Sequence, residues 1–181
     1  ELGWTFIAAM TSFDSAPVEI LAGDLEAAEA ELRRDYDTLE RMGETNYIST
    51  TAALLAEVLF RQGDFDGADE CTRICEELAA HDDVVSQFRW RSVRAKILAS
   101  RGRFAEAETL AREAVALIRR SDDLNSQAEA SLDLAEVLRL ADRPLEAAEA
   151  AREALALFEA KGNTVAAAIA RATLDELAGV S

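Results

Sequence analysis

The chain has 181 residues, enough for one sizeable domain. Hydrophobic residues make up 50% of it, aromatic residues only 6%, and there are two prolines. Much of the apolar content is alanine and leucine, the strongest helix formers, whereas strand-favouring residues are too few and too scattered for a sheet. The composition therefore predicts an all-α protein.

The net charge is −16, from 35 acidic and 19 basic residues. A field of this sign repels phosphate backbones and anionic membrane surfaces, so direct binding to nucleic acid or to a membrane is not expected. The sequence shows no signal peptide, lipidation motif or long apolar run, and a cytoplasmic location is the default expectation. A first residue Glu1 in place of a methionine fits either a piece of a longer polypeptide or a trimmed start.

An internal repeat runs through the chain. Four segments of one pattern begin at Gly23, Gly63, Gly102 and Asp142, which are 40, 39 and 40 residues apart. In each segment an alanine follows five residues after the first position, and a leucine follows 15 or 16 residues after it. A fixed period of this length is the signature of stacked helical hairpins.

Each segment is predicted to form the turn of a helix–turn–helix. Glycine ends a helix because it accepts the left-handed conformation without penalty. Asp24 and Asp64 follow two of these glycines and can cap the next helix, and Pro144 suits a first helical turn. The recurring alanine lets two helix backbones approach each other closely.

In chain order the pattern predicts nine helices. The first covers residues 2–22 and is irregular, with a break near Pro17. The others are expected over 24–42, 45–62, 64–80, 84–101, 103–120, 123–141, 143–160 and 164–178. We expect a single domain over residues 1–181, made of an irregular first hairpin (1–43), three full repeats (44–83, 84–122 and 123–163) and a capping helix (164–181). The predicted fold is a right-handed α-solenoid with a period of 39–40 residues.

The residues at matching places in the repeats resemble the tetratricopeptide repeat. That family has a small residue in its first helix, a glycine between the helices, an aromatic residue two positions later and alanines at two places in the second helix. The matching sets are Ala56, Gly63, Phe65, Ala68 and Cys75; Ala95, Gly102, Phe104, Ala107 and Ala114; and Ala135, Asp142, Pro144, Ala147 and Ala154. This chain departs from the family in its longer period, in having no proline between repeats, and in placing Arg91 and Arg94 at normally apolar positions.

A narrower resemblance covers nearly the whole chain. Stretches such as residues 86–96 and 132–139 look like the C-terminal repeats of large bacterial signalling proteins, which join a class III cyclase or a DNA-binding activator domain to a signal-transduction ATPase. The resemblance implies a regulatory, protein-interaction part of such a polypeptide. Its partner would be a protein or peptide, or another domain of the same chain, held in the concave groove; a homodimer is also allowed. Two alternatives stay open: a small-ligand sensor with a pocket between repeats, and a structural solenoid that mediates oligomerisation.

The sequence offers no catalytic constellation, so no enzyme, cofactor or metal site is predicted. The only histidine, His81, is expected at a helix end, where it would interact with the helix dipole. Cys71 and Cys75 fit no common zinc spacing with it and are expected to be reduced core residues.

One helix, over residues 84–101, is basic against an acidic background. The repeat alignment places Arg89 and Lys96 in the concave groove, beside Glu57 and Phe60 on one side and Asp133 and Glu136 on the other. Arg91 and Arg94 would point toward neighbouring helices and form structural ion pairs. Internal charge pairing and a basic spot that grips a carboxylate or phosphate of a partner are both open interpretations of this helix.

Overall fold

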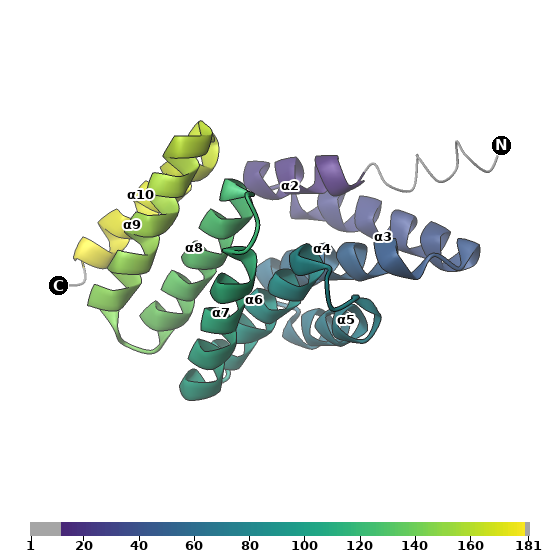
Figure 1. The fold of residues 1–181 in the computed structure, drawn as a ribbon, viewed down its shortest axis with the longest axis horizontal. Coiled ribbons are helices and arrows are strands. Elements are labelled where there is room, and N and C mark those ends of the chain that lie inside the picture. Colours follow the sequence, from purple (N-terminus) through teal and green to yellow (C-terminus); the bar gives the residue numbers. More distant parts are fainter. Residues whose placement is uncertain (1–11, 180–181) are drawn as a thin grey trace. The chain divides into compact units, whose positions relative to one another are not determined.

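The computed structural model describes residues 12–179. Within them the chain forms nine helices and no strand (Figure 1). The helices are α2 (Ser12–Ala22), α3 (Leu25–Met42), α4 (Thr45–Gln62), α5 (Phe65–Leu78), α6 (Val84–Ser100), α7 (Phe104–Ile118), α8 (Leu124–Leu140), α9 (Pro144–Lys161) and α10 (Thr164–Gly179). From α3 onward, each helix begins and ends within two residues of its predicted bounds.

The predicted glycines and aspartate caps lie where these helices end and begin. Gly43, Gly63 and Gly162 follow α3, α4 and α9 in the left-handed conformation, with φ of 73°, 86° and 80°. The side chain of Asp24 accepts a hydrogen bond from Ala27 N at 3.1 Å, and that of Asp64 accepts one from Gly67 N at 3.0 Å. Local turn chemistry therefore fixes the hairpins before any tertiary packing is considered.

The predicted break near Pro17 is wrong. Pro17 lies inside α2, which runs through it without interruption. A proline inside a helix removes one backbone hydrogen bond and can be absorbed by a bend, so the helix need not end there. Residues 2–11 of the first predicted helix lie outside the described residues.

Packing divides the chain into two compact units, with the border inside α6 after Val93. In the first unit α2 packs on α3, α3 on α4 and α4 on α5. Leu32 and Leu39 of α3 and Val58 of α4 are fully buried in its core. The buried carboxylate of Asp35 accepts a hydrogen bond from Ser12 N at 3.1 Å, which ties the first turn of α2 to α3.

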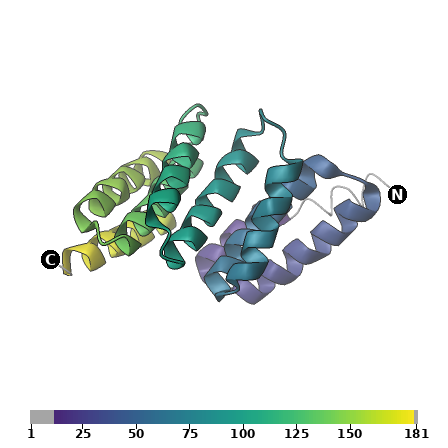
Figure 2. The same cartoon turned by 90° about the horizontal axis from the view of Figure 1, so that it is seen from below.

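In the second unit α7 packs on α8, α8 on α9 and α9 on α10 (Figure 2). The repeat alanines Ala107, Ala114, Ala147 and Ala154 are completely buried. Small side chains at these positions allow the helix backbones to approach closely, and Ile118 is also fully buried. The order of packing confirms the predicted all-α repeat solenoid, while its right-handed twist and the predicted domain bounds stay predictions.

Candidate interaction surface

Lys96, which was predicted to lie in the concave groove, is buried. Only 2% of its side chain is accessible, and its Nζ lies 2.7 Å from Asp133 Oδ1 on α8, so of the two open interpretations internal charge pairing holds for this residue. A buried ammonium is stable only beside such a carboxylate, because removing it from water is costly. Lys96 therefore serves the interior of the second unit and is not available to grip a partner.

Arg91 is held by its own helix. Its guanidinium donates to the backbone oxygen of Gln87 at 2.8 Å and to Gln87 Oε1 at 2.6 Å, and it lies 4.1 Å from the centre of the Trp90 ring. Gln87 is buried and also donates to the backbone oxygens of Ala79 and Ala80 at 3.1 Å. Gln87 thus joins the end of α5 to the basic helix, a role that the sequence did not indicate.

Arg89 and Arg94 are half-buried on α6. The guanidinium carbon of Arg89 lies 5.1 Å from the centre of the Phe88 ring, within the range of a cation–π contact. The ion pairs expected for Arg91 and Arg94 stay predictions.

Glu57 and Phe60 lie on α4, in the same unit as Arg89. The carboxylate of Glu57 accepts a hydrogen bond from Arg61 Nε at 2.6 Å. The Phe60 ring lies 5.5 Å from the Phe65 ring, at the turn between α4 and α5. Phe60 is half-buried and Phe65 is 38% exposed, so this turn presents an aromatic surface to solvent.

Asp133 and Glu136 are three residues apart on α8 and therefore share one face of that helix. Both are half-buried, and Leu132 beside them packs on a cluster of buried residues from α8, α9 and α10. The Lys96–Asp133 ion pair joins two residues of the predicted site within this unit.

Cys71 and Cys75 are free and buried, as predicted. Burial raises the pKa of the Cys71 thiol from 9.0 to about 11. His81 is exposed in the turn after α5, three residues beyond the end of that helix, which corrects its predicted place. The described part of the chain contains no group of three or more histidine, cysteine, aspartate or glutamate residues that could hold a metal ion.

An ion pair that was not predicted recurs on the second helices of the hairpins. An acidic residue six positions after the start of the repeat motif pairs with an arginine one turn later. The pairs are Glu29–Arg33 at 2.7 Å, Asp69–Arg73 at 3.5 Å and Glu108–Arg112 at 2.8 Å. The spacing of four residues was visible in three of the four motifs and could have been found by aligning charges as well as apolar residues.

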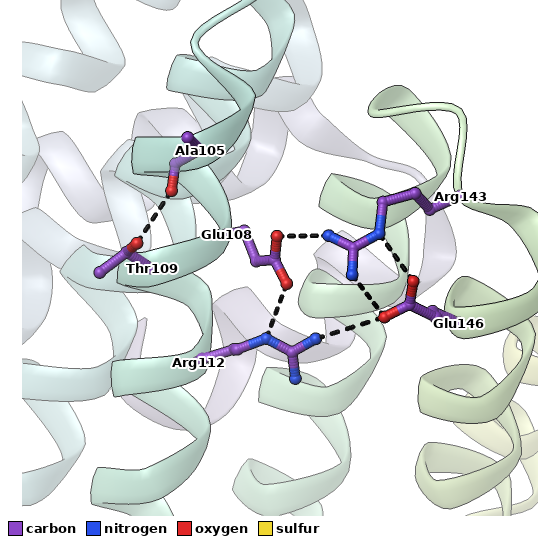
Figure 3. Close-up of polar contacts among 6 residues, drawn as sticks. All are labelled: Ala105, Glu108, Thr109, Arg112, Arg143 and Glu146. Atoms are coloured by element: carbon purple, nitrogen blue, oxygen red, sulfur yellow. Dashed lines mark hydrogen bonds and ion pairs between the residues drawn. The ribbon is translucent and has the colours of Figure 1, made fainter.

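In the second unit this pair grows into a network of four charged side chains (Figure 3). Arg143, at the start of α9, pairs with both Glu108 on α7 and Glu146 on α9, and Arg112 lies 3.7 Å from Glu146. The hydrogen bonds from Arg112 and Arg143 lower the pKa of Glu108, and the one from Arg143 lowers the pKa of Glu146. The network ties two successive second helices together at the surface.

Among the described residues, no helix is long and apolar enough to cross a membrane. The geometry thus consists of packed helical hairpins with charged and aromatic side chains on their surfaces.

Residues 88–160 match the family model of the tetratricopeptide repeat. The chain is similar in fold to BtubC (BKLC) from P. vanneervenii, with a TM-score of 0.57 and 17% identity over 91% of this chain and 77% of that one. It is also similar to a candidate kinesin light chain from Podosopora anserina with nearly identical TPR-like repeats, with a TM-score of 0.54 and 14% identity over 94% of this chain and 92% of that one. No curated protein sequence matches the chain. The chain thus contains a tetratricopeptide-repeat region, and such repeats are generally protein-interaction modules.

Proposed function

We propose that this chain is a non-catalytic, cytoplasmic repeat domain that binds a protein or peptide partner on the surface of its first helices. The single observation that carries the proposal is the tetratricopeptide-repeat match over residues 88–160. Rigid repeats of this kind present an extended surface whose side chains can be varied without changing the scaffold.

In the first unit the binding surface would centre on Glu57, Phe60 and Arg89. Phe60 has a half-buried ring that a partner can cover completely. The charged side chains of Glu57 and Arg89 would pair with groups of the partner and so orient it on this surface. In the second unit it would include Glu136 and the exposed edge of Asp133, of which 22% is accessible. Lys96 is not included because its side chain is buried and its ammonium group is already paired with Asp133.

We further propose that the domain is a regulatory part of a larger bacterial signalling protein that carries an ATPase and either a cyclase or a DNA-binding domain. The similarity of residues 86–96 and 132–139 to the repeats of those proteins supports this context. The partner would then be another domain of the same polypeptide or a protein that reports the signal to it.

The test is affinity capture from the source cell with three forms of the chain as bait. They are the wild type, the double variant Phe60→Ala/Arg89→Glu, and Glu77→Gln as a matched surface control on α5, where Glu77 is exposed. A partner identified with the wild type is then produced on its own, and its Kd for each form is measured by calorimetry.

We expect the double variant to weaken binding at least tenfold, since the aromatic ring that the partner would cover and a charge are lost together. Glu77→Gln should leave the Kd unchanged. Equal affinity of all three forms, with each shown to be folded by circular dichroism, would refute the proposed surface. Turnover of a substrate by the isolated chain would refute the non-catalytic assignment.

A further inference from the structure

Three ion pairs join α7 to α9 across the surface of the second unit. Glu108 pairs with Arg143, Arg112 lies 3.7 Å from Glu146, and Arg119 lies 2.5 Å from Glu153. The partners rise together along both helices, which means that α7 and α9 run in the same direction. The pairs therefore form the rungs of a ladder.

One rung of this ladder is missing. Ala116 lies four residues after Arg112 and three before Arg119, so it faces α9 between their two rungs. On α9, Glu149 lies three residues after Glu146 and four before Glu153, at the matching level. Glu149 is exposed and takes part in no hydrogen bond or ion pair with any described residue. The Glu149 carboxylate therefore lacks the arginine of α7 with which Glu146 and Glu153 pair.

A groove of about 270 Å³ lies at the missing rung. Its lining includes Val115, Ala116, Leu134, Leu138, Glu149 and Ala150. All but Ala116 and Glu149 among these are buried apolar side chains, which form the floor of the groove. The groove thus has an apolar floor, a carboxylate on one wall and an ion pair at each end.

We infer that this groove receives a lysine or arginine side chain from a basic segment of a partner protein. The methylene stem would lie on the apolar floor, as such stems do when they cover hydrophobic surface, and the cationic head would complete the rung with Glu149. The neighbouring rungs would fix the position of that side chain along the two helices.

Size and charge favour this occupant over others. Pockets for small molecules are generally about 300–1,000 Å³, whereas this groove is smaller and open, and so fits one side chain better than a metabolite. The groove is lined by three carboxylates, Glu146, Glu149 and Glu153, and by two arginines, Arg112 and Arg119. Both arginines are already paired with Glu146 and Glu153, so the remaining charge, that of Glu149, favours a cation over an anion. The net charge of −16 also steers cationic segments toward the molecule. The site lies on the second helices of the hairpins and is separate from the surface of the proposed function.

The test uses the whole chain, labelled with ¹⁵N, and follows backbone amide shifts at physiological ionic strength. The probe is a short blocked peptide of leucine and lysine at helical spacing, and the control probe has glutamine in place of each lysine. Four forms are compared: wild type, Glu149→Gln, Ala116→Arg and Glu77→Gln. Ala116→Arg supplies the missing cation from the chain itself and fills the groove.

We expect the lysine peptide to shift amides of the groove-lining residues in the wild type and in Glu77→Gln. Glu149→Gln should weaken this binding about threefold, the effect of one exposed ion pair, and Ala116→Arg should weaken it about tenfold or more because the groove is occupied. A double-mutant cycle of Ala116→Arg with Glu149→Gln should show coupling in the free energy of unfolding, which checks the geometry without any peptide.

The inference is overturned if groove amides do not shift, if the glutamine peptide shifts them equally, or if Ala116→Arg binds like the wild type. The variant Phe60→Ala, which tests the proposed function, should not change any of these shifts. The two ideas can therefore fail separately.

Discussion

Lys96 and Asp133 form an ion pair between residues 37 positions apart in the sequence, with Nζ 2.7 Å from Oδ1. The lysine side chain is 2% exposed and the aspartate side chain 22%. The pair joins the last turns of α6 to the middle of α8, inside the second unit. The sequence of α6 suggests a basic docking surface, but one of its cations, Lys96, forms an internal ion pair instead.

Replacing Lys96 with Met should destabilise the second unit by about 3 kcal/mol, because Asp133 would lose the cation that faces it in a partly buried site. The double variant Lys96→Met/Asp133→Leu should regain most of this loss, since it leaves no buried charge behind. Urea unfolding followed by circular dichroism gives both values. Arg152→Met, on the exposed side of α9, is the matched control and should change stability by no more than about 0.5 kcal/mol. A loss below about 1 kcal/mol for Lys96→Met would show that the pair is solvated.

The two cysteines should react slowly with a thiol reagent in the native protein. Cys75 is fully buried and Cys71 is 9% exposed, and the pKa of Cys71 is raised to about 11, so the reactive thiolate is scarce at neutral pH. Labelling should speed up in denaturant as both thiols become exposed. Rapid labelling of the native chain would contradict the burial of this pair.

The raised pKa of Cys71 also predicts a loss of stability at alkaline pH. Between pH 9 and about 11 the unfolded chain releases the thiol proton while the folded chain keeps it, so a rising pH favours unfolding. The slope contributed by this group should approach about 1.4 kcal/mol per pH unit within that window and be absent below it. Cys71→Ala should remove this contribution, which urea unfolding at a series of pH values can measure.

The charged network of α7 and α9 should stabilise the protein only modestly. Glu108→Gln removes the carboxylate shared by Arg112 and Arg143, but all three side chains are partly exposed, and a loss of up to about 1 kcal/mol is expected. The loss should shrink in high salt, where exposed pairs are screened. Because the pKa of Glu108 is lowered in the folded state, its contribution is present above its ordinary pKa of 4.5 and disappears as the pH falls through the folded value.

Comparing unfolding of the wild type and Glu108→Gln at low and high salt tests this directly. Glu77→Gln, on the exposed side of α5, serves as the control and should show no salt-dependent difference. A salt-independent loss would mean that Glu108 acts through packing and not through its charge.

The positions of the helices followed from the sequence because turn signals are local. Glycine in the left-handed conformation and an aspartate cap act within a few residues, so Gly63 and Asp64 mark the turn between α4 and α5 whatever surrounds them. Burial of the repeat alanines followed for the same reason, since their spacing of 39 or 40 residues shows one structural role.

The candidate site could be predicted only in part, because the environment of a charged side chain depends on residues far away in the sequence. Nothing in the local sequence shows that the Lys96 side chain is buried against Asp133 and not exposed to solvent. The buried amide of Gln87 was missed for a similar reason: its partners are backbone oxygens at the end of α5. Periodicity predicts which face a residue occupies, but not whether a partner covers it.

Among the residues that the structure describes, Asp142 is the one non-glycine residue with a positive φ, at 58°. It stands in the repeat where Gly23, Gly63 and Gly102 have φ of 81°, 86° and 77°. Aspartate tolerates the left-handed region better than most residues but still pays a steric cost that glycine avoids. Asp142→Gly should therefore stabilise the second unit by about 0.5–1 kcal/mol, reduced somewhat by the greater freedom of glycine in the unfolded chain.

The matched control is the reverse change at the equivalent turn, Gly102→Asp, which should destabilise the same unit by a similar amount. A Cβ at Gly102 meets no atom within 4 Å, so the cost comes from backbone conformation and not from a clash. Thermal unfolding by calorimetry measures both changes in one protein. If Asp142→Gly lowers the Tm while Gly102→Asp also lowers it, the side chain of Asp142 must make a stabilising contact that outweighs its backbone strain, and the conformational argument for this turn would be wrong.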